Sequence, residues 1–142
     1  MGYYLRFIVT DPPPLSVAHL DAALRSVDPA YTIDGYDLRH GDGLYGEIEV
    51  NPRGTGLCDE ELGELADFIE DAGEGDRARV LAVLKQATAI VAVRVLWQGR
   101  EAAETLTRLD PLWGWLFDHR AGLLQADGEG YYDEDGRVLD VP

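Results

Sequence analysis

Residues 3–10 alternate between the two faces of an expected strand that is covered mainly on one face. The apolar face comprises Tyr3, Leu5, Phe7 and Val9, and Arg6 lies on the other face. The strand is expected to end at Asp11 and the prolines at positions 12–14, because proline cannot donate to a ladder of hydrogen bonds. Ser16 can then cap a helix that extends to residue 27.

A hairpin is expected next. Residues 31–38 have strand periodicity interrupted by Gly35, residues 41–43 provide a tight connection, and residues 44–50 alternate again with glutamates on one face. This pattern favours a hairpin with one solvated face.

Helical spacing returns from Asp59, which can cap a helix to about residue 72, and Asp76 can cap a further helical stretch to residue 87. Residues 88–97 are apolar on both faces and rich in β-branched side chains, as in a central strand covered from both sides.

The predicted order is β-α-β-β-α-β, which favours an α+β fold: a ferredoxin-like split antiparallel sheet with helices on one face. A C-terminal extension follows, in which a helix over residues 101–109 restarts at Asp110-Pro111 and continues to residue 120. A β-hairpin completes the chain, with strands at 122–126 and 131–132, the latter pairing with 138–141 across a type I′ turn at Asp135-Gly136. We expect one domain over residues 1–142, with a core at 1–98 and an appendage at 99–142.

Charge narrows the range of partners. The chain has twenty-seven acidic residues and twelve basic ones, which gives a net charge of −15. Nucleic acids and anionic membranes would repel such a surface, so neither is expected as a partner. The single Cys58 and the absence of a signal-peptide pattern or an apolar run of membrane length favour a cytoplasmic protein.

The acidic residues are concentrated between positions 58 and 76, where nine carboxylates occur without a base. Like charges three or four residues apart on a helix, such as Glu64 and Asp67, each cost about 0.2–0.5 kcal/mol. A surface that docks on a cationic partner would account for them, and a solvated face that keeps the protein dispersed is the alternative.

Aromatic residues form the second candidate. A single helix stripe cannot bury Trp113, Trp115 and Phe117 together, so part of this segment, with Tyr131 and Tyr132, could anchor an interface. A core helix beneath the terminal strands is the alternative.

Metal or acid–base chemistry has weaker support. The candidate set is His119, Asp127 and Glu129, but an EF-hand loop begun at Asp127 would place tyrosines at positions 5 and 6. No motif specifies a reaction, and no cofactor is expected.

The preferred hypothesis is a non-enzymatic module that binds a basic protein surface. In charge and size the chain resembles small acidic inhibitors, such as immunity proteins that neutralise cationic nuclease toxins. A small metal-dependent or ligand-binding enzyme and a charge-adapted housekeeping domain are the alternatives. The expected partner-binding residues are Glu61, Glu64, Asp67, Glu70, Asp71, Trp113, Trp115, Asp127, Glu129 and Tyr131.

Overall fold

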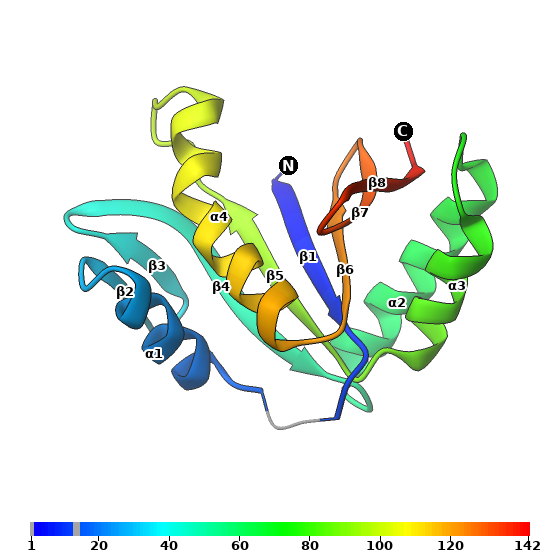
Figure 1. The fold of residues 1–142 in the computed structure, drawn as a ribbon, viewed down its shortest axis with the longest axis horizontal. Helices are drawn as coiled ribbons and strands as arrows, with labels where there is room; N and C mark the ends of the chain where they lie inside the picture. Colours follow the sequence, from blue (N-terminus) through cyan, green and yellow to red (C-terminus); the bar gives the residue numbers. More distant parts are fainter. Residues whose placement is uncertain (1, 13–14) are drawn as a thin grey trace.

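The computed structural model describes residues 2–12 and 15–142, which form eight strands and four α-helices (Figure 1). The elements are β1 (Tyr3–Val9), α1 (Val17–Val27), β2 (Tyr31–Asp34), β3 (Asp37–His40), β4 (Gly43–Pro52), α2 (Gly56–Phe68), a 3₁₀ turn (Ile69–Asp71), α3 (Arg77–Gln86), β5 (Ala89–Val95), α4 (Ala102–His119), β6 (Gly122–Ala126), β7 (Gly130–Asp133) and β8 (Gly136–Asp140). Pro13 and Pro14, expected to help end β1, lie outside the described residues.

All eight strands belong to one antiparallel sheet in the order β2-β3-β4-β5-β1-β6-β7-β8. Phe7 of β1 lies opposite Val91 of β5 on one side and opposite Leu124 of β6 on the other. The protein is therefore a mixed α+β protein. The ferredoxin-like strand order is not confirmed, because β5 lies between β4 and β1 with antiparallel pairing on both sides.

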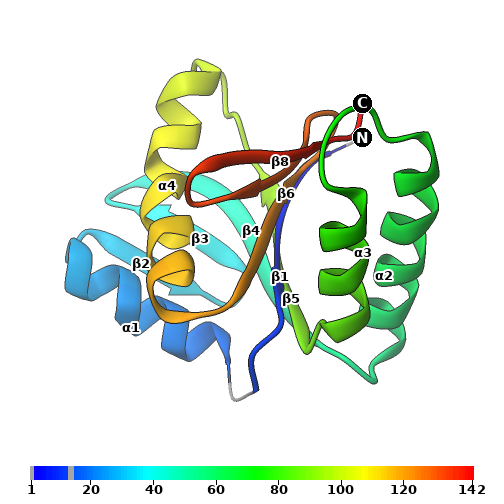
Figure 2. The ribbon, with the colours of Figure 1, turned by 45° about the vertical axis from the view of Figure 1, so that its right-hand side comes forward.

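Helices cover both faces of the sheet, so the expectation of helices on one face is wrong (Figure 2). α1 and α4 pack on one face, and α2 and α3 pack on the other. The apolar pattern of residues 88–97 explains this arrangement. In β5, Val91 and Val93 are fully buried under α1 and α4, while Ile90 is fully buried on the opposite side. The prediction of a central strand covered on both faces is confirmed.

Two segments differ from the predicted boundaries. Residues 31–40 form a hairpin of two short strands, because Gly35 adopts a φ of 62° and reverses the chain instead of interrupting one strand. α4 is continuous from Ala102 to His119 with Pro111 in its interior, so the helix does not restart at Asp110.

Two of the four α-helices in the described residues have an N-terminal side-chain cap. Ser16 accepts a hydrogen bond from the His19 amide at 3.2 Å, and Asp76 accepts one from the Arg79 amide at 3.0 Å, which confirms both caps. The predicted Asp59 cap is wrong, since α2 begins at Gly56. Asp59 lies in the first turn and accepts a hydrogen bond from the Gly54 amide instead.

The C-terminal strands extend the same sheet through β6, and β7 pairs with β8 as predicted. The type I′ assignment is wrong because the turn lies at Glu134 and Asp135, and neither residue has a positive φ. Asp133 stabilises this turn by accepting hydrogen bonds from the amides of Asp135 and Gly136. Gly130 has a φ of 137°, and a Cβ there would collide with the Leu139 carbonyl oxygen.

The two helical layers are offset along the sheet. The core under α1 and α4 includes residues of β1 to β6, whereas the core under α2 and α3 includes residues of β1 and of β5 to β8. The α2 side of β4 is therefore not covered by a helix. Among the described residues, no helix is both long and apolar enough to cross a membrane.

Candidate functional site

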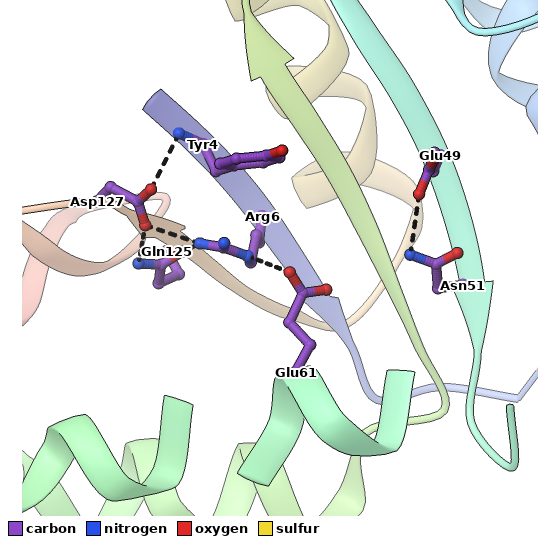
Figure 3. Close-up of polar contacts among 7 residues, drawn as sticks. All are labelled: Tyr4, Arg6, Glu49, Asn51, Glu61, Gln125 and Asp127. Atoms are coloured by element: carbon purple, nitrogen blue, oxygen red, sulfur yellow. Dashed lines mark hydrogen bonds and ion pairs between the residues drawn. The ribbon is translucent and has the colours of Figure 1, made fainter. Parts of the chain in front are cut away.

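A long surface groove follows from the offset of the helices. On the α2 side of β4, β5 and β1, three adjoining hollows of about 140, 330 and 290 Å³ share lining residues from one to the next. We call this surface the acidic groove; its lining includes Tyr4, Arg6, Tyr36, Glu47, Glu49, Asn51, Leu57, Glu60, Glu61, Glu64, Phe68 and Asp127. Its central part, between β4 and the first turns of α2, is drawn in Figure 3.

Arg6 of β1 joins three elements at the base of the groove (Figure 3). Its Nε donates to Glu61 of α2 at 2.6 Å, and its Nη1 donates to Gln125 and Asp127 at 2.7 Å each. Asp127 also accepts hydrogen bonds from the Gln125 amide group at 3.1 Å and the Tyr4 backbone N–H at 3.0 Å. The strand alternation that places Arg6 on the α2 side thus provides a fixed cation at the centre of an acidic surface.

The charge of Arg6 is held by its neighbours. Only 14% of its side chain is exposed, and burial alone would lower the pKa of its guanidinium. The hydrogen bonds from Arg6 to Glu61 and Asp127 outweigh burial and raise that pKa above its ordinary value. Arg6 therefore remains a cation, and its donors are directed to partners within the protein.

The remaining acidic residues of the groove exceed its bases. Arg94 pairs with Glu47, donating from Nε at 2.7 Å, so both arginines that line the groove are bound to carboxylates of its own lining. Within residues 2–12 and 15–142, Glu49, Glu60 and Glu64 form no ion pair. The groove therefore carries carboxylates that the protein itself does not neutralise.

The other acids predicted on this helix lie outside the groove. Asp67, Glu70 and Asp71 are exposed near the end of α2 and in the 3₁₀ turn that follows, and in the described part of the chain they form no ion pair. With Glu64 they form one acidic surface without ion pairs. Glu61 does not belong to this surface, because its carboxylate is paired with Arg6.

Exposed apolar side chains are spaced along the same groove. Four large apolar residues are strongly exposed in the described chain, and three of them line the groove: Tyr36 (63%), Leu57 (66%) and Phe68 (62%). They come from the β2–β3 turn, the start of α2 and the end of α2. Large apolar side chains exposed among charged residues are typical of a binding surface.

Three aromatic residues predicted at the site are not exposed. Trp113 is buried in the core under α1 and α4, and Tyr131 is buried in the core under α2 and α3. Trp115 is half-buried and stacks on His119, with 4.7 Å between ring centroids. These aromatic residues therefore do not form one exposed cluster with the acidic helix.

The side chains of Asp127 and Glu129 line different pockets although the two residues are only two positions apart. Asp127 lines the acidic groove, whereas Glu129 accepts hydrogen bonds from the hydroxyls of Tyr3 at 2.6 Å and Tyr132 at 3.0 Å. Those three residues line a separate pocket of about 190 Å³ that includes Trp113 of α4. The turn between β6 and β7 thus directs the two carboxylates to different pockets.

The metal site considered from the sequence is not formed. His119 lies before the start of β6, where its Nδ1 contacts the Trp115 carbonyl oxygen at 3.0 Å, whereas Asp127 follows the other end of that strand. In the described chain, no group of three or more His, Cys, Asp or Glu side chains could hold a metal ion. Cys58 is fully buried, and burial raises the pKa of its thiol to about 11, so its role is in packing.

No protein-family model, curated protein or solved structure matches this chain. The function of the acidic groove is therefore inferred from its geometry alone.

Sequence reasoning did not select Arg6, Tyr36, Leu57 or Phe68 as site residues. One signal was present for Phe68: the buried stripe of α2 comprises Leu62, Leu65 and Ile69, so an aromatic residue directly before Ile69 among acids lies off that stripe. Tyr36 could not be found in this way, because only strand pairing brings it across from Tyr4.

Proposed function

We propose that this chain is a non-enzymatic binding module that engages a basic protein surface through the acidic groove and the adjacent exposed side of α2. The observation that carries the proposal is the placement of Tyr36, Leu57 and Phe68 along a groove whose carboxylates include several without an ion pair among the described residues.

The unpaired acids argue for an external partner on energetic grounds. Glu60 with Glu64, and Glu64 with Asp67, are like-charge neighbours that weaken a helix by about 0.2–0.5 kcal/mol each. The chain has arginines that pair with acids elsewhere, as Arg79 does with Asp133 at 2.9 Å. Carboxylates left unpaired at a groove would instead complement a cationic surface and accelerate its association.

Apolar side chains in the groove would give the complex a long lifetime, which charge alone does not provide. Rim charges mainly affect the association rate, whereas buried aromatic side chains at an interface determine how long the complex lasts. Phe68 at one end of the groove and Tyr36 at the other provide such anchors, with Leu57 between them. An inhibitor or regulator of a basic protein, of the immunity type, would have this combination of surface features.

The test begins with the identification of a basic partner that is retained from host extract at low salt. Purified partner is then used for stopped-flow or biosensor kinetics. Simultaneous Glu64→Lys, Asp67→Lys and Asp71→Lys substitution should slow association by about tenfold or more and flatten its salt dependence. The dissociation rate should change less.

A matched control carries the same net charge. Asp42, Glu104 and Asp118 are exposed and lie away from the groove, so their simultaneous replacement by Lys should leave association much closer to that of the wild type. Equal slowing by both triple variants would reduce the effect to overall charge. Unchanged association in the α2 variant would refute the proposal.

A further inference from the structure

The hollow beside Phe68 contains a buried polar group that the fold does not satisfy. This hollow, about 290 Å³ in volume, lies between α2 and the β6–β7 turn, and Tyr131 is part of its lining. Tyr131 is 1% exposed, and its hydroxyl has no hydrogen-bond partner in the described structure. Buried hydroxyls are nearly always paired, so this one indicates a missing donor or acceptor.

The phenol oxygen lies near the charged part of the same lining. Burial raises the pKa of Tyr131, the Arg6 guanidinium lowers it, and the Asp127 carboxylate raises it. The phenol therefore stays neutral, and its oxygen has a free lone pair near Arg6 and Asp127.

The charge of the lining selects a cation. Three carboxylates, from Glu61, Glu64 and Asp127, face the single guanidinium of Arg6. That guanidinium already donates to Glu61, Gln125 and Asp127. An incoming anion would meet net negative charge with Arg6 already occupied, whereas a cation would find Glu64 free of any ion pair within the described residues.

The remaining walls select the shape of that cation. Leu65, Phe68 and Val141 provide apolar surface, which suits an aliphatic stem. An ammonium group is compact and offers three donors, and the lining offers acceptors on Glu61, Glu64 and Tyr131. The volume is near the lower limit of small-ligand pockets, which fits one side chain better than a larger molecule.

We propose that this pocket binds a primary ammonium group on an aliphatic stem, supplied by a lysine side chain of the basic partner, with Tyr131 and Glu64 as acceptors. This inference deepens the proposed function and rests on it for the identity of the donor protein. Phe68 would then pack against the lysine methylenes at the pocket entrance.

The test uses small probes and no partner protein. The ¹⁵N-labelled protein is titrated with Nα-acetyl-lysine methylamide, and the amide resonance of Gly128, which lines the pocket, is followed. The lysine probe should give a saturable shift, and the uncharged isostere Nα-acetyl-norleucine methylamide should give none. Equal shifts with both probes, or no saturation with the lysine probe, would overturn the assignment.

Two substitutions assign the acceptors. Tyr131→Phe removes an unpartnered hydroxyl, so the variant should fold with stability at least equal to that of the wild type while its dissociation constant for the lysine probe rises about 2–10-fold. Glu64→Gln should also weaken binding, and Glu70→Gln, outside the pocket, should not. A folded Tyr131→Phe protein with unchanged affinity would overturn the role of the hydroxyl.

The source of the ammonium is tested separately. Tighter binding of 1,5-diaminopentane than of the lysine probe would overturn the assignment to a protein side chain and indicate a free diamine. Probe binding does not require a partner. A failed probe titration would therefore refute the lysine pocket without affecting the kinetic test of the groove. Conversely, a failed kinetic test with a positive probe titration would leave a cation pocket without the proposed interface.

Discussion

The two faces of the sheet use the same alternating pattern for different purposes. On one face, α1 and α4 pack on strands β1 to β6 and bury aromatic residues, with Phe7 packed edge-on against Phe117 at 5.0 Å between centroids. On the other face, α2 and α3 pack on β1 and β5 to β8, and β4 is left without a helix. The covered face provides stability, and the uncovered part of the other face forms the acidic groove together with the adjoining side of α2 and the β2–β3 turn.

The difference shows that position relative to the helices, and not residue type, decides what a side chain does. Phe7 is on the apolar face of β1 and is fully buried, whereas Phe68 lies off the buried stripe of α2 and is 62% exposed. Glu61 and Glu64 lie three residues apart on α2, yet one is bound to Arg6 and the other is unpaired among the described residues. Each pair can be tested by matched substitutions.

The largest effect is expected for the phenylalanines. Phe7→Ala removes a fully buried ring and should lower the free energy of unfolding by about 3–5 kcal/mol. Phe68→Ala should change it by no more than about 0.5 kcal/mol. Urea denaturation followed by circular dichroism measures both. A large loss of stability in Phe68→Ala would mean that this ring belongs to the core and not to a binding surface.

A smaller and opposite pair of effects is expected for the glutamates. Glu61→Gln weakens a charge-assisted contact of the largely buried Arg6, and with 22% of the Glu61 side chain exposed we expect a loss of about 1 kcal/mol. Glu64→Gln relieves repulsion from Glu60 and Asp67 and should stabilise the protein by about 0.2–0.5 kcal/mol. The same denaturation experiment distinguishes them, and destabilisation by Glu64→Gln would show that Glu64 has a structural partner.

The smallest effect concerns the contact that ties α3 to the β7–β8 hairpin. The hydrogen bond from Arg79 and the amides of Asp135 and Gly136 lower the pKa of Asp133. A lowered folded-state pKa gives stability that is present above the unfolded value of about 3.9 and is lost as the pH falls through the folded value.

Asp133→Asn should therefore be less stable than the wild type at pH 7, and the difference should shrink as the pH falls below about 4. Thermal unfolding at a series of pH values measures this. Asp135→Asn is the control, because its carboxylate makes no contact within the described structure. A difference that is constant with pH would assign the effect of Asp133→Asn to turn geometry instead of charge.

Much of the secondary structure is readable from the sequence because its determinants are local. The caps at Ser16 and Asp76 depend on a hydroxyl or carboxylate three residues before the amide that it accepts from. The central position of β5 follows from its apolar residues on both faces. The predicted cap at Asp59 failed because α2 begins earlier, at Gly56, where no side chain forms a cap hydrogen bond.

The site was predicted in part. The acidic side of α2 follows from composition and helical spacing, and its unpaired residues Glu64, Asp67, Glu70 and Asp71 lie where the periodicity places them. Trp113 and Tyr131 were expected to be exposed but are buried, because α4 and the C-terminal hairpin pack onto the sheet, and Tyr131 takes part only through the lining of the hollow beside Phe68. No sequence spacing could show that Arg6 would meet Glu61 and Asp127, which are 55 and 121 residues away.

The sequence by itself determined most of the elements, the excess of negative charge and its concentration on one helix, because periodicity, capping and composition act over a few residues. Only the tertiary structure decided the strand order, the offset of the two helical layers and the groove that this offset leaves open. Those features depend on which distant strands pair and which apolar faces meet, and such contacts are chosen by the packing of the whole chain.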